Sequence, residues 1–233
     1  MGHLLNQIIA LFLLPLVAVA LSSPPASAQT YDLRLGDSFL GTLVYKEDSG
    51  AAQIEATLSN TPLGLFNGTF EAVSRSVQTT SGTSLREYQS LGVSSRKTRE
   101  IAVLLDQEGV VETTVRPQSE RTNLSNPGNV ADIVIDPVSA LGIMLSAAEC
   151  PSEIRFYDGR RVISLTSLRS QRIDGELSCE LSYSVIAGPG HLSPLYIRNM
   201  SLNLSYSRRA DTEVLSRMLL RAGLWSLSIV RRD

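Results

Sequence analysis

The sequence predicts a mainly β fold: a curled antiparallel sheet, half-barrel or open barrel, with one short helix packed on it. Three observations support this class. From Tyr31 onward, apolar and polar residues mostly alternate, and turn residues recur at short intervals. Asp158-Gly159 separates two apolar-rich runs, which is a strong hairpin signal. Asp136-Pro137 precedes the one segment with clear helical spacing.

The leading segment has the composition of a secretory signal. Leu4 to Leu21 is almost wholly apolar, and the first charged residue is Asp32. The small-residue triplet Ala26-Ser27-Ala28 follows, so we expect residues 1–28 to be a signal peptide cleaved after Ala28. The alternative is an uncleaved membrane anchor, which the interrupting Pro15 disfavours.

Residues 29–233 are then predicted to form a single β-rich domain of 233 − 28 = 205 residues. A formal net charge of −2 indicates neither nucleic acid nor an anionic membrane surface as a partner. After signal cleavage we expect no stable membrane span. The predicted location is the periplasm of a Gram-negative bacterium.

Short alternating runs define the predicted strands. The first two form a hairpin around Gly36-Asp37. Residues 213–221 fit a short helix or a strand, and we favour the strand. The other predicted strands are 31–35, 39–46, 51–59, 69–79, 84–91, 95–105, 109–115, 177–186, 200–206 and 225–229.

The helix is predicted over Asp136 to Ala148, against the concave side of the sheet. Asp136 suits the N-cap, and Pro137 suits the first helical position because its missing N–H would be unpaired there. Apolar residues then follow at helical spacing. Before the helix, Arg116 to Ala131 is polar and rich in helix breakers; such loops are functional or mobile, and we favour a mobile loop.

The two cysteines, Cys150 and Cys179, are an even pair in a chain predicted to be exported. A disulfide is therefore expected, with free thiols as the alternative. Cys-x-x-Cys spacing, typical of redox or metal sites, is absent.

The hairpin around Asp158-Gly159 holds the candidate site. With a two-residue turn at these positions, the predicted pairs are Tyr157 with Arg160, Phe156 with Arg161 and Ile154 with Ile163. Arg161 would then share a face with Ile154, Phe156, Ile163 and Leu165. One interpretation places its stem on apolar surface and its guanidinium in water. The other places it inside a concave sheet, where it binds a carboxylate or phosphate of the chain or of a ligand. The candidate ligand-binding residues are Arg161, Phe156 and Arg160.

Several of these residues resemble a known family. They are Tyr31-Asp32-Leu33, the helix start from Asp136 to Leu141, the run from Phe156 to Arg161, and Cys150 and Cys179 with Ile186-Ala187-Gly188. The chain resembles the bacterial exported family called domain of unknown function 3108 over nearly all of residues 29–233. The resemblance implies a periplasmic protein and supplies no catalytic residues. Pro189 departs from the aromatic residue expected after Gly188.

Motifs for common chemistry are missing. His191 is the only histidine after the predicted signal, and we expect it to be an exposed turn residue. The sequence has no nucleophile elbow and no phosphate-binding loop. Ser94 and Lys97 match Ser-x-x-Lys, but on a strand residues three apart point to opposite faces. We expect that the protein is not an enzyme and that it binds no metal and no cofactor.

Two functions remain open. The first is a non-enzymatic envelope protein that binds an apolar ligand, such as a lipid, or a partner protein of the envelope in the concave sheet. By fold-level analogy alone, such a sheet resembles those of periplasmic lipoprotein carriers. The second is a structural or assembly factor of the envelope whose sheet is filled by its own side chains. An empty apolar cavity beneath the helix would favour the first, and a filled one the second.

Overall fold

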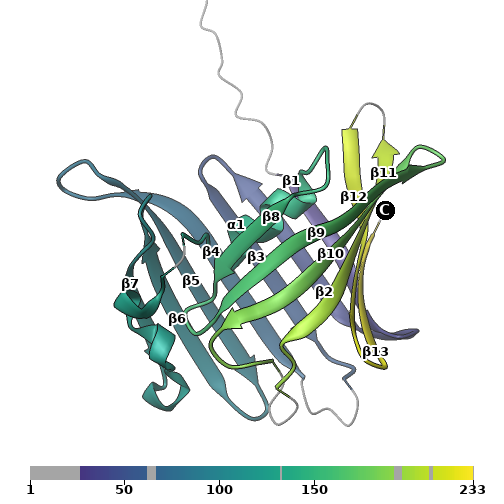
Figure 1. Ribbon diagram of the computed structural model, residues 1–233. Coiled ribbons are helices and arrows are strands. Elements are labelled where there is room, and N and C mark those ends of the chain that lie inside the picture. The colour runs from purple at the N-terminus through teal and green to yellow at the C-terminus, as the bar shows by residue number, and fades with distance from the viewer. Residues whose placement is uncertain (1–26, 62–66, 132, 192–195, 210–211, 233) are drawn as a thin grey trace, which may run out of the picture.

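A single antiparallel sheet of thirteen strands makes up most of the computed structural model (Figure 1). The structure describes residues 27–61, 67–131, 133–191, 196–209 and 212–232. The strand order is β7-β6-β5-β4-β3-β2-β1-β13-β12-β11-β10-β9-β8, so the first and last strands pair in the middle of the sheet. The fold class predicted from the alternating pattern is confirmed.

The first half of the sheet follows chain order through seven strands. They are β1 (Ser27–Leu35), β2 (Ser38–Asp48), β3 (Ala51–Leu58), β4 (Gly68–Gln78), β5 (Ser84–Ser94), β6 (Thr98–Leu105) and β7 (Val110–Arg116). Of the predicted signal peptide, residues 1–26 lie outside the described part. Ser27 and Ala28 belong to β1, where they pair with Glu47 and Lys46.

The second half contains the helix and six more strands. They are α1 (Pro137–Leu145), β8 (Glu153–Tyr157), β9 (Val162–Ile173), β10 (Glu176–Ala187), β11 (Asn199–Arg209), β12 (Thr212–Ala222) and β13 (Trp225–Arg231). The preference for a strand over 213–221 is confirmed by β12. No helix among the described residues is long and apolar enough to cross a membrane.

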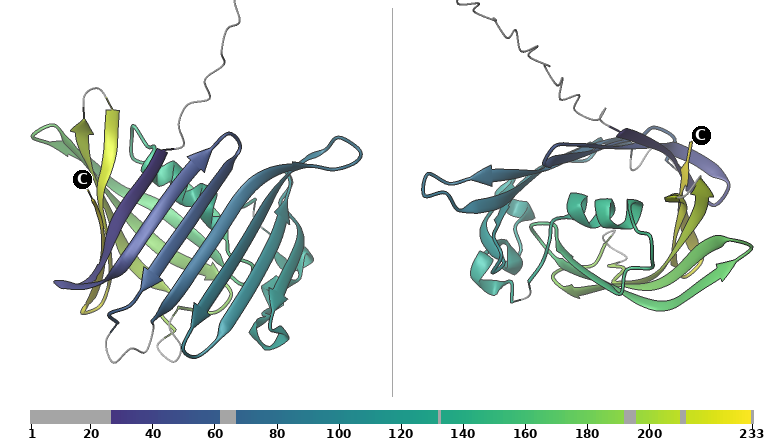
Figure 2. Two further views of the ribbon diagram at one scale, coloured as in Figure 1. Left: turned by 180° about the vertical axis from the view of Figure 1, so that it is seen from behind. Right: turned by 90° about the horizontal axis from the view of Figure 1, so that it is seen from above.

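The sheet curls around α1, which lies on its concave side (Figure 2). Asp136 caps this helix as predicted: its Oδ1 accepts hydrogen bonds from the backbone N–H groups of Val138 and Ser139, each 2.9 Å long. Its Oδ2 accepts a 2.7 Å hydrogen bond from Ser74 Oγ on β4, which fixes the helix start to the sheet. The helix ends at Leu145, three residues before the predicted Ala148.

Tyrosines fill the space between α1 and the sheet. Tyr206 donates a 2.8 Å hydrogen bond to the carbonyl of Met144 in the last turn. A Cβ at Gly142 would lie 2.5 Å from the Tyr45 hydroxyl, so a glycine is needed for this close approach. Because Tyr88 is also buried in the same core, the concavity beneath the helix is occupied by the chain itself.

The two edge strands, β7 and β8, are joined by the segment between β7 and α1 rather than by a strand ladder. This segment forms three 3-10 turns, η2 (Gln118–Glu120), η3 (Asn123–Ser125) and η4 (Pro127–Asn129). Tyr157 at the end of β8 donates a 2.5 Å hydrogen bond to the Leu124 carbonyl. Further along, Ile135 forms a parallel bridge with Phe156. The interpretation of 116–131 as a mobile loop does not fit, because the segment packs on both edges.

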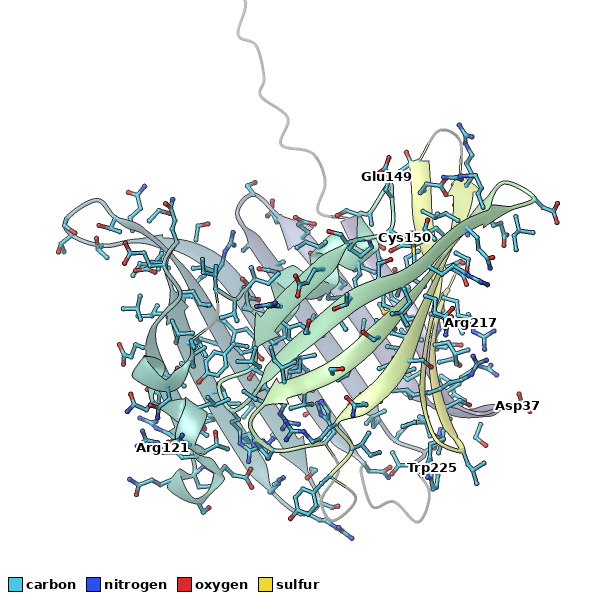
Figure 3. All side chains as sticks on the ribbon, in the orientation of Figure 1. Asp37, Arg121, Glu149, Cys150, Arg217 and Trp225 are labelled. Carbon is cyan, nitrogen blue, oxygen red and sulfur yellow. A yellow bond between two sulfur atoms is a disulfide. The ribbon has the colours of Figure 1, made fainter. Side chains whose placement is uncertain are left out.

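The predicted pairing of Cys150 with Cys179 is confirmed, with their Cα atoms 5.5 Å apart. The bond ties the stretch that follows α1 to β10. Cys150 and its neighbour Glu149 lie at the end of the molecule opposite Trp225 (Figure 3). Trp225, the first residue of β13, is 58% exposed.

Candidate functional site

The turn between β8 and β9 differs from the predicted one. Tyr157 pairs with Val162 and Phe156 with Ile163, so the two central residues are Gly159 and Arg160 instead of Asp158 and Gly159. Only Gly159 has a positive φ, 88°, the pattern of a type II′ turn. The predicted register was wrong by one turn position, which moves each partner by two residues. Because two residues restore the same face, the predicted grouping of Phe156 with Ile163 still holds.

Asp158 explains this register. Its Oδ1 accepts hydrogen bonds from the backbone N–H groups of Arg160 and Arg161, at 3.0 and 2.9 Å. The side chain thereby satisfies two donors of the turn, and Asp158 stays outside the left-handed region that a central position would require.

Arg161 is buried, with 7% of its surface exposed, so its guanidinium does not reach bulk water as the first interpretation supposed. Its Nε lies 2.9 Å from Asp158 Oδ2 but makes no hydrogen bond, so this contact is an ion pair. The carboxylate partner therefore comes from the same turn.

His191 completes the surroundings of Arg161. Arg161 Nη1 lies 2.7 Å from His191 Nδ1, and His191 Nε2 lies 2.6 Å from the Tyr183 hydroxyl. Because a guanidinium only donates, Nδ1 must accept, and the ring proton is placed on Nε2. Burial and, second, the charge of Arg161 lower the pKa of His191 to about 4. The prediction of an ordinary exposed histidine was wrong.

Phe156 also contacts Tyr183. Their ring centroids are 6.5 Å apart in an edge-to-face arrangement, and Tyr183 is in turn 5.6 Å from the His191 ring. Phe156 is thus connected to Arg161 through Tyr183 and His191.

Arg160 points to a different partner, Glu120 on η2. Its Nε donates a 2.5 Å hydrogen bond to the Glu120 carbonyl, and its Nη2 lies 3.3 Å from Glu120 Oε2. Lys97 Nζ lies 3.1 Å from Glu120 Oε1, and Arg99 also pairs with this carboxylate. Burial alone would raise the pKa of Glu120, but hydrogen bonds from Lys97 and Arg99 and the charges of Arg99 and Arg160 hold it below its usual value.

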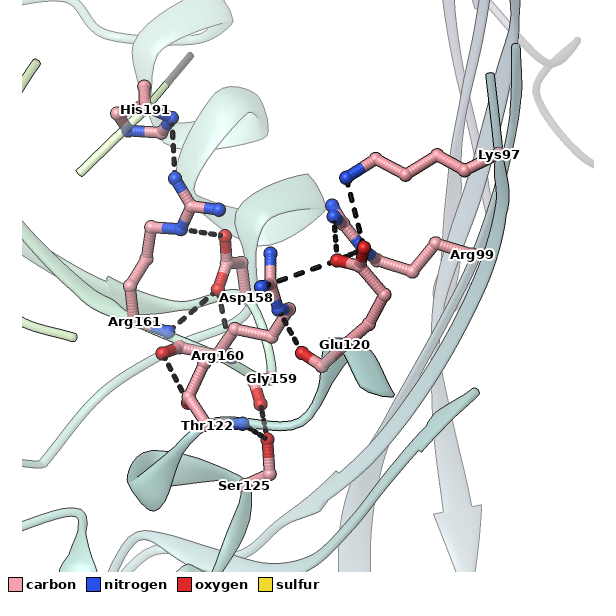
Figure 4. Close-up of polar contacts among 10 residues, drawn as sticks. All are labelled: Lys97, Arg99, Glu120, Thr122, Ser125, Asp158, Gly159, Arg160, Arg161 and His191. Atoms are coloured by element: carbon pink, nitrogen blue, oxygen red, sulfur yellow. Dashed lines mark hydrogen bonds and ion pairs between the residues drawn. The ribbon is translucent and has the colours of Figure 1, made fainter. Parts of the chain in front are cut away.

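These side chains form one basic cluster (Figure 4): Lys97, Arg99, Arg160 and Arg161 with Glu120 and Asp158. Four cations face two carboxylates, so its formal charge is 4 − 2 = +2. Burial and, second, the charge of Arg99 lower the pKa of Arg160. Within the part of the chain that the structure describes, the two carboxylates of the cluster therefore leave part of its positive charge unneutralised.

A pocket of about 220 Å³, here called the end pocket, borders the basic cluster. Lys97 and Arg99 belong to its lining. Its apolar lining includes Leu33, Ala56, Leu58, Phe70 and Val93. The end pocket is the place in the described structure where apolar surface and the unneutralised cations meet.

The end pocket opens on the concave face. Phe70 lies two residues before the buried Ala72 on β4, so both side chains point to the same face. Phe70 stands directly opposite Gly92 on β5, which has no side chain to cover it. As a result Phe70 is 38% exposed. Among the described residues, the apolar concavity is filled beneath α1 but open at this end.

Of the predicted site residues, the structure brings Arg161, Arg160 and Phe156 to one end of the sheet but gives each a different partner. Sequence reasoning missed Lys97 and Arg99, and it missed Glu120, which follows them by 23 and 21 residues. No local pattern connects them, because a hairpin and a 3-10 turn meet only through the fold. Among the described residues, no three His, Cys, Asp or Glu side chains are placed to hold a metal ion.

No protein-family model and no curated protein matches the chain. Among solved structures, it is similar to a β-barrel-like protein of the domain of unknown function DUF1849 from Brucella abortus. The sequence identity is 13% and the TM-score is 0.48, over 89% of this chain and 96% of that chain. The resemblance to the domain of unknown function 3108 family is untested by these comparisons and stays a prediction.

Proposed function

We propose that this protein is a non-enzymatic protein of the Gram-negative periplasm that binds an apolar ligand in the end pocket. The observation that carries this proposal is the exposed Phe70 ring on an otherwise filled concave face. Buried apolar lining beside a few polar groups is the usual composition of a small-molecule site.

Export is supported by the Cys150–Cys179 disulfide, because such bonds persist in oxidising compartments. The predicted signal peptide and the resemblance to an exported family point the same way. A non-enzymatic role is supported by His191, because its pKa of about 4 lies well below the near-neutral value that suits a general base.

The second candidate is a structural or assembly factor of the cell envelope. It is favoured by the tyrosines that fill the concavity beneath α1, which is the filled arrangement expected of such a protein. The two candidates differ in what they say about the end pocket: a ligand site in the first, and unused space in the second.

Native mass spectrometry of the protein purified from periplasm separates them. We expect an added mass from a co-purifying small apolar molecule. Gly92→Leu should remove it by filling the end pocket, because a Cβ at this position meets only Phe70 Cδ2, at 3.8 Å. Gln89→Leu is the matched control: it adds the same side chain to β5 on the opposite face and should keep the added mass. A bare protein in every sample would favour the structural role.

A further inference from the structure

The end pocket is small. Its 220 Å³ lie below the range of about 300–1,000 Å³ usual for drug-sized ligands. A diacyl lipid would not fit inside. One unbranched chain segment would, with the remainder of the molecule outside.

The charged groups that line the pocket are all positive. Lys97 and Arg99 are the charged residues of its lining, and both donate to the single carboxylate of Glu120. Arg160 shares this carboxylate as well. Three cations on one carboxylate leave donors that a second anion could use, and a guanidinium suits carboxylates and phosphates through paired N–H groups.

The positive charges of these side chains are also only partly screened by solvent. The side chains of Arg99 and Arg160 are 24% and 14% exposed, so solvent screens them less than ordinary surface arginines. Lys97, at 52%, stands at the more open side. An anion at this rim would meet partly desolvated donors, and a chain attached to it would lie along Phe70.

We propose that the ligand of the end pocket is a single-chain anionic amphiphile, with its carboxylate or phosphate at Arg99 and Lys97 and its chain along Phe70. This inference rests on the proposed function and adds the chemical class of the ligand. The Glu120 carboxylate pairs with these cations in the absence of a ligand and competes with an incoming headgroup for them. The chain thereby carries its own weak competitor for the site.

Three probes with the same decyl chain test the headgroup: undecanoate, decyl phosphate and 1-decanol, titrated into the full mature protein by NMR. At low salt, at least one anion should bind about tenfold more tightly than 1-decanol. The tighter of the two anions identifies the headgroup as carboxylate or phosphate. Equal affinity for all three would overturn the inference and leave the apolar site intact. Binding of none of them would overturn the proposed function as well.

Four variants locate the binding. Arg99→Gln should lower the affinity for the anions about fivefold to tenfold and leave 1-decanol unchanged. Arg75→Gln is its control, because Arg75 pairs with Glu87 away from the pocket and should change nothing. Gly92→Leu should weaken all three probes. Glu120→Gln should raise the affinity for the anions, since it removes the competitor.

The sign of the Glu120→Gln effect is the sharpest outcome. If Glu120 only held the cluster together, Glu120→Gln would loosen the cluster and lower the affinity for all three probes. That result would contradict the proposed competition. Thermal unfolding of each variant shows whether it is folded. If Arg99→Gln and Arg75→Gln change the anion affinity equally, the rim of the end pocket is not the binding site.

Discussion

The chain contains two Asp-Gly turns, and they behave differently. Asp174-Gly175 connects β9 and β10 with positive φ at both residues, 51° and 86°, and a Cβ at Gly175 would meet nothing within 4 Å. Asp158-Gly159 connects β8 and β9 with positive φ at the glycine only, and a Cβ at Gly159 would lie 2.4 Å from Ile101 Cγ2. The first is a free hairpin tip with the turn that the dipeptide favours; the second is docked on the opposite half of the sheet.

The difference shows that the dipeptide determines a turn only where nothing else contacts it. At the docked turn, Asp158 uses its carboxylate to hold two backbone N–H groups and Arg161. Ser125 Oγ donates a 3.0 Å hydrogen bond to the Gly159 carbonyl. These contacts select a turn one residue further along the chain, and they place Arg160 and Arg161 in the basic cluster.

Removing the charge of each turn aspartate should give the largest difference in stability between the two turns. Asp158→Asn leaves the Arg161 guanidinium buried without a carboxylate, and we expect the free energy of unfolding to fall by about 3 kcal/mol. Asp174→Asn, at an exposed position that asparagine tolerates, should change it by less than about 0.5 kcal/mol. Urea unfolding of both variants measures the difference. Equal losses would mean that Arg161 does not depend on Asp158.

Alanine in place of each turn glycine should give the next largest difference in stability between the two turns. Gly175→Ala costs only the left-handed conformation, about 1 kcal/mol of unfolding free energy. Gly159→Ala adds the clash with Ile101 and should cost about 2–3 kcal/mol. In the background of Ile101→Ala, the extra cost should disappear, which a double-mutant cycle measures. An unchanged extra cost would show that the turn does not rest on Ile101.

The docked turn should also respond to pH, through His191. Its pKa is lowered to about 4 in the folded protein, against 6.5 for an ordinary histidine. Between these values the unfolded chain binds more protons, so stability is full above pH 6.5 and falls as the pH drops towards 4. The loss should be on the order of 2 kcal/mol, discounted for partial exposure of the ring.

Urea unfolding between pH 7 and pH 5 tests this, because most carboxylates stay ionised there. His191→Gln should flatten the dependence in this window, and Asp174→Asn should keep the slope of the unchanged protein. A slope that survives in His191→Gln would assign the dependence to other groups.

Much of the architecture followed from local patterns. Alternation located the strands, and Asp136-Pro137 located the helix start. These signals are readable because caps and side-chain alternation depend on residues a few positions apart. The predicted register of the central hairpin was wrong. Asp158 could either occupy a central position of the turn or accept hydrogen bonds from it, and only its tertiary contacts select the second.

The sequence by itself determined the curled antiparallel sheet, the capped helix, the cysteine pair and the shared face of Phe156 and Ile163. The tertiary structure decided how the edges β7 and β8 are joined, and that Lys97, Arg99, Glu120 and Arg160 meet beside an open pocket. The reason is physical: the cluster depends on charges from the turn between β8 and β9, a 3-10 turn and the chain around the start of β6. Long-range Coulomb attraction leaves no periodic pattern along the chain.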